Sequence, residues 1–591
     1  MRHAGRSRPN AVLREQDDGV TTTSAPAPLP SDLDIARAAA LRPLEEVVAG
    51  TGLDPADLEP YGRHVAKVPL RAAHDLADRP QATYVLVTAI TPTPLGEGKT
   101  TTAVGLAQGL VARGHRATVA LRQPTMGPTF GIKGGAAGGG YSQVVPMETM
   151  NLHLTGDFHA VTAAHNLLAA MVDNHLHHGN ELGIEPHSVA WRLVLDVNDR
   201  ALRNVVVGLG ARMDGVPRQG GFDITAASEV MVILSLATDL GDLRARLGRI
   251  VVGYSFDGEP ITAEQLKAAG AMAVILKDAL APNLLQTLEG GPALVHTGPF
   301  GNIATGNSSV VADLIGSRMG DFLVTEAGFG SDMGAERFFD VKCRVSGLRP
   351  DVAVLVATVR ALKAHSGRFT VTPGKPLPPE MLAENPDDVR AGAANLTHHI
   401  EILRSFGVSP VVAMNAFPGD HDSEHAVVRE IAEAAGARFA ISRHVALGGK
   451  GALPLVEAVE EAAAEPTSFS YAYDLDEPLV DKITAVARDV YGATGIDLSP
   501  AAKTGLEQFE KLGYGEFPVI IAKTHLSISS DPTLLGAPRG WRMPVREVRA
   551  AAGAGYVYAI AGDMRTMPGL AKHPAAERID LDADGTIIGL S

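Results

Sequence analysis

The residues best suited to chemistry form a glycine-rich turn that ends in Lys99 and Thr100. Backbone N–H groups at Gly96 and Gly98 can approach a polyphosphate, because no Cβ stands in the way. Lys99 can then reach the terminal phosphates, and the hydroxyl of Thr100 can bind Mg²⁺. The usual phosphate-loop pattern has glycine where this chain has Thr93. An ordinary strand-to-helix turn is the alternative, but the flanking segments favour nucleotide binding.

These residues need a strand before them and a helix after them. Residues 83–90 form a continuous apolar and β-branched run, which is typical of a strand buried on both faces. Apolar side chains recur at helical spacing over 99–113, and Gly114 ends that run. A second apolar run, 117–121, leads to Arg122. The segment therefore predicts one βαβ unit with the glycine-rich turn between its strand and its helix.

Length and composition narrow the class of protein. A chain of 591 residues is too long for one core, so we expect two to four domains. Apolar and charged contents of 45% and 20% are ordinary for a globular protein, and no run of about 18 apolar residues predicts a membrane span. The net charge of −15 argues against nucleic-acid or membrane-surface partners. A single cysteine, Cys343, fits a reducing cytoplasm.

Further apolar runs predict a parallel sheet with helices on both faces, an α/β fold. They are 250–253, 322–325, 352–357 and 411–414. Ligands of such sheets bind beyond the carboxyl ends of the strands. We therefore expect polar residues that follow these strands to converge on one crevice, although each alone could be a capping or turn residue. They are Thr91, Arg122, Glu326, Arg360 and Asn415.

The chain divides into four predicted parts. Residues 1–30, rich in arginine, proline and threonine, have no apolar face and predict a disordered extension. A helix should start near Ser31. A large nucleotide-binding domain is expected over 31–370, a second α/β domain over 371–465 and a C-terminal domain over 466–591. The glycine-dense stretch 122–141 suits either a linker or a structured anion-binding loop.

The turn with Thr93 in place of glycine resembles the phosphate loop of the formate–tetrahydrofolate ligase family. The resemblance extends from about Ser31 to Leu590 and includes long strings that are specific to that family. These strings are residues 91–102, 130–141, 155–159, 199–204, 326–330, 340–344 and 566–570. The resemblance implies a parallel sheet like that of P-loop nucleoside triphosphate hydrolases.

The resemblance also implies an activity and a set of site residues. Members of the family use ATP and Mg²⁺ to join formate to tetrahydrofolate through formyl phosphate. They are homotetramers stimulated by a monovalent cation, K⁺ or NH₄⁺. By resemblance, Lys99, Arg122 and Asp157 are catalytic, Thr100 binds magnesium, and Phe417 and Pro418 belong to the folate pocket. The ATP-binding residues would be Thr93, Pro94, Leu95, Gly96, Glu97, Gly98, Lys99 and Thr100.

Several positions near the expected site depart from the family pattern, among them Asn307 in place of a cysteine and changes at Leu447 and Lys450. Three others bear on the acceptor. Gln123 replaces a glutamate, Thr305 replaces a histidine, and Val445 stands where the family has a tryptophan opposite Phe417. Valine cannot supply the second aromatic wall of a pterin slot. The sequence therefore predicts an ATP-dependent formate–tetrahydrofolate ligase. A relative with the same acyl-phosphate chemistry but another acceptor or acid, and a catalytically silent nucleotide-binding relative, remain as alternatives.

Overall fold

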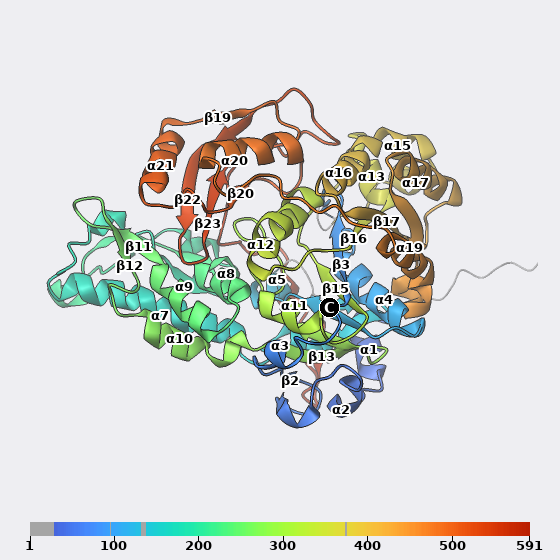
Figure 1. Cartoon of the computed structure of the whole chain (residues 1–591), viewed down its shortest axis with the longest axis horizontal. Helices are drawn as coiled ribbons and strands as arrows, with labels where there is room; N and C mark the ends of the chain where they lie inside the picture. Colours follow the sequence, from blue (N-terminus) through green and yellow to red (C-terminus); the bar gives the residue numbers. More distant parts are fainter. Residues whose placement is uncertain (1–28, 95, 132–136, 373–374, 591) are drawn as a thin grey trace, which may run out of the picture.

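The computed structural model describes residues 29–94, 96–131, 137–372 and 375–590. Its centre is a twelve-stranded sheet with helices on both faces (Figure 1), which confirms the predicted α/β class. The strand order along the sheet is β1-β2-β13-β14-β4-β15-β3-β16-β17-β18, and β5 and β6 join it beside β13. From β14 to β18 along this order the strands are parallel, whereas β13, β2 and β1 are antiparallel to their neighbours.

The strands of this sheet are short and lie far apart in the sequence. Their bounds are β1 Glu59–Pro60, β2 Ala66–Lys67, β3 Thr83–Ala89, β4 Ala117–Leu121, β5 Gly138–Gly139, β6 Ser142–Val145, β13 Asn283–Thr287, β14 Pro292–Val295, β15 Phe322–Glu326, β16 Val352–Ala357, β17 Ser409–Asn415 and β18 Arg438–Ser442. The predicted strands 83–90, 117–121, 322–325, 352–357 and 411–414 are thus confirmed, with small shifts at their ends.

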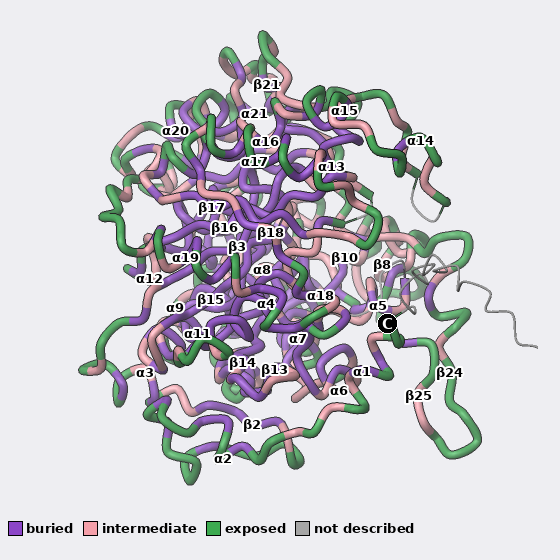
Figure 2. The backbone as a smooth tube through the Cα atoms, turned by 90° about the vertical axis from the view of Figure 1, so that its right-hand side faces the viewer, coloured by how far each residue is buried: buried purple, intermediate pink, exposed green. Residues whose placement is uncertain are grey.

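Strand β3 shows why a continuous apolar run forms a central strand. Tyr84 and Leu86 enter the core on one face of the sheet, while Val85 and Val87 enter the core on the other face. All four are essentially inaccessible to solvent, and the strands around β3 are buried along their whole length (Figure 2). A strand buried on both faces needs apolar residues at every position, so it shows no alternation.

Helices cover each face of the sheet. Helices α4 (Lys99–Ala112) and α19 (Leu453–Ala463) supply apolar side chains to one core, and α16 (Ala393–Ser405) supplies them to the other. Helix α17 (Asp422–Ala434) links β17 to β18, and α13 (Val359–His365) follows β16. The predicted helix over 99–113 is thus confirmed.

Other segments pack outside this sheet. Helices α7 (Asp157–His177), α8 (Glu229–Leu236), α9 (Leu240–Arg249) and α10 (Ala269–Leu276) pack together around a further core (Figure 1), to which β2, β13 and β14 also contribute. The predicted strand 250–253 was wrongly assigned to the parallel sheet. It forms β11 (Val251–Tyr254), which pairs antiparallel with β12 (Pro260–Thr262) in a separate hairpin. Ile250 and Val252 pack into the core around α7, α8, α9 and α10.

The C-terminal region has smaller sheets. Strands β20 (Val519–Ala522), β23 (Tyr556–Ile560) and β22 (Glu547–Ala551) form one of them, beside α20 (Leu479–Ala485) and α21 (Pro500–Lys511). Within the described ranges, no helix is both long enough and apolar enough to cross a membrane.

The predicted division into domains stays a prediction. Strands β17 and β18, which belong to the expected second domain, are hydrogen-bonded members of the same sheet as β3. The first described helix, α1 (Asp32–Ala38), begins where expected, and the hydroxyl of Ser31 accepts a hydrogen bond from the Asp34 amide. Residues 1–28 of the expected extension lie outside the described residues.

Candidate active site

The glycine-rich turn joins β3 to α4 as its sequence requires. Gly98 has a φ of 79°, in the left-handed region, and α4 begins at the next residue, Lys99. The hydroxyls of Thr101 and Thr102 donate to the Gly98 carbonyl at 2.7 and 2.8 Å. The first N–H groups of this 14-residue helix have no acceptor within the helix and point toward the turn. The start of α4 is therefore a favourable place for an anion. Leu95 lies outside the described residues.

Two contacts fix the shape of the turn. The backbone N–H of Thr93 donates to the Glu97 carboxylate at 2.7 Å, which closes the turn on itself. The amide of Asn415, at the end of β17, donates to the Glu97 carbonyl at 3.0 Å. A Cβ on Gly98 would collide with this same Asn415 amide. Position 98 therefore requires glycine both for its backbone angle and for the space beside it.

Glu326 connects the turn to Arg122. One carboxylate oxygen of Glu326, the last residue of β15, accepts a hydrogen bond from the Thr100 hydroxyl at 2.7 Å. Its other oxygen lies 3.8 Å from Nε of Arg122, which follows β4. The Glu326 side chain is 6% exposed and that of Arg122 is 29% exposed, so the guanidinium still reaches solvent. The structure thus brings together three predicted residues at the carboxyl ends of neighbouring strands.

Thr91 is buried beneath the turn and does not face the crevice with Arg122. Its hydroxyl lies 2.9 Å from Nε2 of His399 and accepts a hydrogen bond from the Asn395 amide at the same distance. Nε2 of His365 lies 2.9 Å from the Thr91 carbonyl oxygen. Burial lowers the pKa of His399 to about 3, so this ring is neutral. The sequence missed these partners because both histidines come from segments far along the chain.

Asp157 is held in a buried ion pair at the start of α7. Its two carboxylate oxygens lie 2.7 and 2.8 Å from Nζ of Lys67, and one also accepts a hydrogen bond from Asn283 at 2.8 Å. The side chains of Asp157 and Lys67 are each 3% exposed. Burial lowers the pKa of Lys67, and the nearby Asp157 carboxylate opposes that shift. The catalytic role predicted for Asp157 stays a prediction.

Gln123 lies between Arg122 and the start of α7. Its backbone N–H donates to the Thr297 carbonyl at 2.6 Å, and its carbonyl packs against Gly298. The ring of Phe158, next to Asp157, also contacts Gly298. The side-chain oxygen of Gln123 is buried and has no hydrogen-bond partner among the described residues.

Thr305, the second departure from the family pattern, is buried near Glu326. Two residues further on, the Asn307 amide donates to the Glu326 carbonyl at 3.3 Å. The preceding part of this segment contributes the Pro299 carbonyl, which accepts a hydrogen bond from Arg122 at 3.5 Å. The backbone and side chains of residues 299–307 therefore contact both Arg122 and Glu326.

Phe417 and Val445 contact different residues. Phe417 follows β17, and its ring lies 4.3 Å from the guanidinium carbon of Arg360, a cation–π contact. Val445 is in α18 (His444–Leu447), where its carbonyl accepts a hydrogen bond from the Tyr141 N–H at 2.9 Å. Pro418 is exposed. The expected slot between Phe417 and Val445 stays a prediction.

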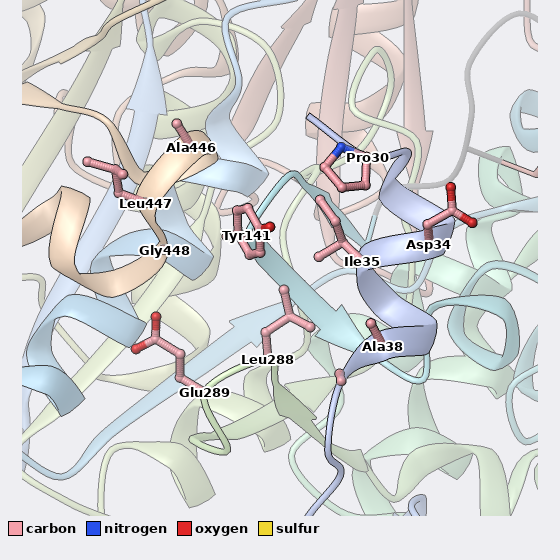
Figure 3. A pocket seen from close by; sticks show the side chains of 11 residues that line it. Pro30, Asp34, Ile35, Ala38, Tyr141, Leu288, Glu289, Ala446, Leu447 and Gly448 are labelled. Atoms are coloured by element: carbon pink, nitrogen blue, oxygen red, sulfur yellow. The ribbon is translucent and has the colours of Figure 1, made fainter. Parts of the chain in front are cut away.

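A cavity of about 630 Å³ lies behind α18, on the side of α1. Figure 3 shows Ile35 and Ala38 of α1 on one side, Leu447 and Gly448 on the other, and Tyr141 between them. Glu289 lies at its base, and its carboxylate accepts a hydrogen bond from the Gly449 N–H at 2.7 Å. The lining does not include the residues of the turn between β3 and α4.

His444, in α18, makes the free energy of unfolding depend on pH. Burial lowers the pKa of His444 to about 4, and its Nδ1 lies 2.7 Å from the Ser442 hydroxyl. The folded state holds the ring neutral, whereas the unfolded chain binds a proton near pH 6.5. The stability due to this group is therefore complete above about pH 6.5 and is lost as the pH falls toward 4, by up to ~1.4 kcal/mol per pH unit.

We therefore expect wild type to lose free energy of unfolding relative to His444→Gln as the pH falls from about 6.5 to 4, because glutamine does not bind a proton. Urea unfolding at several pH values measures it. His74→Gln is the control for the substitution itself, because this side chain is 94% exposed and its replacement should leave the free energy of unfolding at neutral pH close to that of wild type. A His444→Gln difference that does not change with pH would contradict the neutral buried ring.

The fold and this site define an α/β protein whose glycine-rich turn opens a helix at the carboxyl edge of a mainly parallel sheet. A family model described as formate–tetrahydrofolate ligase matches residues 30–591. The chain belongs to the formate–tetrahydrofolate ligase family.

Curated relatives carry the same name. The formate–tetrahydrofolate ligase of Cutibacterium acnes is 70% identical over 560 residues, which cover 95% of this chain and 100% of the relative. That of Saccharopolyspora erythraea is 67% identical, with 95% and 100% covered. The first such ligase of Rubrobacter xylanophilus is 65% identical, with 95% and 99% covered.

Proposed function

We propose that the chain uses ATP to join formate to tetrahydrofolate, forming 10-formyltetrahydrofolate through formyl phosphate. Membership of the family over nearly the whole chain supports the overall reaction. The observation that carries the chemistry is the contact chain from Thr100 through Glu326 to Arg122. It places a cationic side chain next to the start of the phosphate-binding helix.

ATP fits the turn between β3 and α4. The positive φ angles of Gly96 and Gly98 and the start of α4 at Lys99 support this assignment, because such a turn before a helix suits the terminal phosphates. Mg²⁺ fits too, because it prefers oxygen ligands and is bound by one or two carboxylates together with substrate phosphates. The Thr100 hydroxyl and the Glu326 carboxylate would hold it. The ion would neutralise charge on the terminal phosphates.

The reaction has two steps. A formate oxygen attacks the γ-phosphorus of ATP, the bond to the ADP oxygen breaks, and formyl phosphate forms. A tetrahydrofolate amine then attacks the formyl carbon, the carbon–oxygen bond to phosphate breaks, and the amine loses its proton to solvent or a base. Lys99 and Arg122 would stabilise negative charge on the transferred phosphoryl group and on the departing phosphate.

Asp157 suits a positioning role in this scheme. Its carboxylate is already bound to Lys67 and Asn283, so it is poorly placed to exchange protons with a substrate. It holds the first turn of α7, and the next residue, Phe158, packs on Gly298 beside Gln123. We place the ion pair behind the wall of the formyl phosphate site.

The acceptor pocket would be formed by Gln123, Phe417, Pro418 and Val445. The guanidinium of Arg360 lies over one face of the Phe417 ring, and the proposal assigns the opposite face to a pterin. Val445 would close the slot less well than tryptophan.

Val445→Trp should therefore tighten tetrahydrofolate by up to about tenfold, since an added aromatic contact is worth roughly 0.5–1.5 kcal/mol. The Michaelis constant for ATP should not change, because α18 is not part of the phosphate-binding turn. Titration of both substrates against wild type and variant measures this. Tight folate binding by wild type, weakened by the tryptophan, would mean that another residue closes the slot.

The proposed function is tested by product formation with ATP, formate and tetrahydrofolate, leaving out each in turn. All three should be required. Formate-dependent ATP turnover without any effect of tetrahydrofolate would point to another acceptor, and no turnover to a silent relative. A cytoplasmic homotetramer stimulated by K⁺ or NH₄⁺ completes the proposal, and light scattering and cation titration test its assembly and stimulation.

A further inference from the structure

Helix α1 is bonded to the glycine-rich turn 138–141. A carboxylate oxygen of Asp32, the first residue of α1, accepts a hydrogen bond from the Gly140 N–H at 2.7 Å. The carbonyl of Asp32 accepts a second bond from the Gln143 amide at 3.0 Å. Gln143 is completely buried, and its amide also donates to the Gly140 carbonyl at 2.8 Å. Asp32 therefore binds the turn at Gly140 through its carboxylate, and binds Gln143 of β6, just beyond the turn, through its backbone carbonyl.

The same turn is bonded on its other side to α18. The Tyr141 N–H donates to the Val445 carbonyl at 2.9 Å, and the Ser142 hydroxyl donates to the His444 carbonyl at 3.0 Å. A Cβ on Gly140, whose φ is 55°, would collide with the Val445 carbonyl. The turn and α18 are therefore in backbone contact. Figure 3 shows Tyr141 between α1 and α18.

Both partners also lie against the phosphate-binding helix. The methyl group of Thr101 is 3.4 Å from the place of a Cβ on Gly139, and the His444 side chain fills the space beside Gly105 of α4. Nε2 of His444 lies 3.5 Å from the Thr102 hydroxyl. Because α4 is anchored in the main core, α18 has a fixed support on that side. The turn that Asp32 contacts supports α18 on another side, and residues 448–452, which follow α18, also pack against it.

We infer that Asp32 is a positioning residue for the acceptor side of the active site. It acts through Gly140 and Tyr141 on the backbone of Val445, and it does not touch a substrate. This inference rests on the proposed function, in which Val445 forms one wall of the acceptor pocket. A carboxylate suits the task because a hydrogen bond from a backbone N–H to an ionised acceptor is stronger than one to a neutral group.

The docking of α1 itself does not depend on this carboxylate. Leu33 and Ile35 are each 6% exposed, and Arg37 forms an ion pair with Glu148 and a hydrogen bond to the Ile587 carbonyl. Loss of the Asp32 side chain should therefore free the turn and leave the helix in place. Asp34 offers a matched control. It is an exposed acid in the same first turn, and its carboxylate accepts a hydrogen bond from the Ser31 hydroxyl within the same helix start.

The test compares Asp32→Ala, Asp32→Asn and Asp34→Ala in steady-state kinetics. Asp32→Ala should raise the KM for tetrahydrofolate about tenfold, since charge-assisted bonds of this kind contribute on that order. Its KM for ATP should change by less than about twofold. Asp32→Asn keeps an acceptor oxygen without the charge and should show about a threefold rise. Asp34→Ala should match wild type in both constants.

Several results would overturn the inference. One is a folded Asp32→Ala enzyme with an unchanged KM for tetrahydrofolate, and another is an equal rise in both constants. If Asp32→Ala does not fold, Asp32→Asn decides. Amide exchange over 137–142 and the tetrahydrofolate KM must then both exceed those of Asp34→Ala. A wild type with no tetrahydrofolate-dependent product would instead refute the proposed function, and amide exchange would still report on the contact between Asp32 and the turn.

Discussion

Replacing Lys99 with alanine should lower kcat for the ATP-dependent reaction by about a hundredfold or more, the usual effect of deleting a charge-stabilising group from an active site. Lys99 is the first residue of α4, where the N–H groups of the helix and the preceding Gly98 would form the proposed phosphate site. Alanine keeps the helix, because it has the highest helix propensity. The loss should therefore appear in phosphoryl transfer and leave the fold unchanged.

The measurement is kcat with saturating ATP, formate and tetrahydrofolate, together with a urea unfolding curve. Lys503→Ala removes an exposed lysine from the first turn of α21 and should leave both unchanged. Turnover of a folded Lys99→Ala enzyme close to that of wild type would exclude the proposed role.

The central strands could be predicted from the sequence because their burial is complete. β3, β16 and β17 pack apolar side chains on both faces, so each leaves an uninterrupted run that needs no knowledge of its neighbours. The order of the strands could not be predicted. β15 lies between β3 and β4, although more than 200 residues separate it from either in the chain. Strand order of this kind depends on packing across the whole sheet.

Seven strands of the twelve-stranded sheet were not predicted: β1, β2, β5, β6, β13, β14 and β18. Two of them show why. β13 and β14 form an antiparallel hairpin, with residues 288–291 between them. Their apolar runs are interrupted by Asn283, Gln286 and Pro292, whose polar groups and missing N–H hide the strand pattern. The signal that could have identified them is the turn at Gly290 and Gly291 between two short runs.

In the candidate site, too, local features could be predicted and contacts between distant residues could not. The glycine-rich turn and Arg122 are readable because local spacing defines them. The sequence placed Glu326 at the crevice but gave it no partner, since its contact with Thr100 crosses between strands. The ion pair of Asp157 with Lys67 and the bond of Asp32 with Gly140 join residues about 100 positions apart. A single sequence carries no signal for such pairs.

Glu326→Gln should lower kcat by about a hundredfold, by the same reasoning on active-site charge. Glutamine has the size of glutamate and can still accept the hydrogen bond from the Thr100 hydroxyl. It removes the negative charge that lies 3.8 Å from Arg122 and that would help to hold Mg²⁺. We therefore expect a higher Mg²⁺ concentration at half-maximal rate as well as a lower kcat.

The substitution separates two roles for Glu326. If the carboxylate only orients the Thr100 hydroxyl, glutamine should keep most of kcat and the Mg²⁺ dependence of wild type. If its charge is required, both should change while the urea unfolding midpoint stays close to that of wild type. Thr325→Val is the matched control. It alters the neighbouring buried residue of β15, whose hydroxyl donates to the Ala120 carbonyl, away from Thr100 and Arg122. Its kcat and Mg²⁺ dependence should match those of wild type, so a loss confined to Glu326→Gln locates the effect in the carboxylate charge.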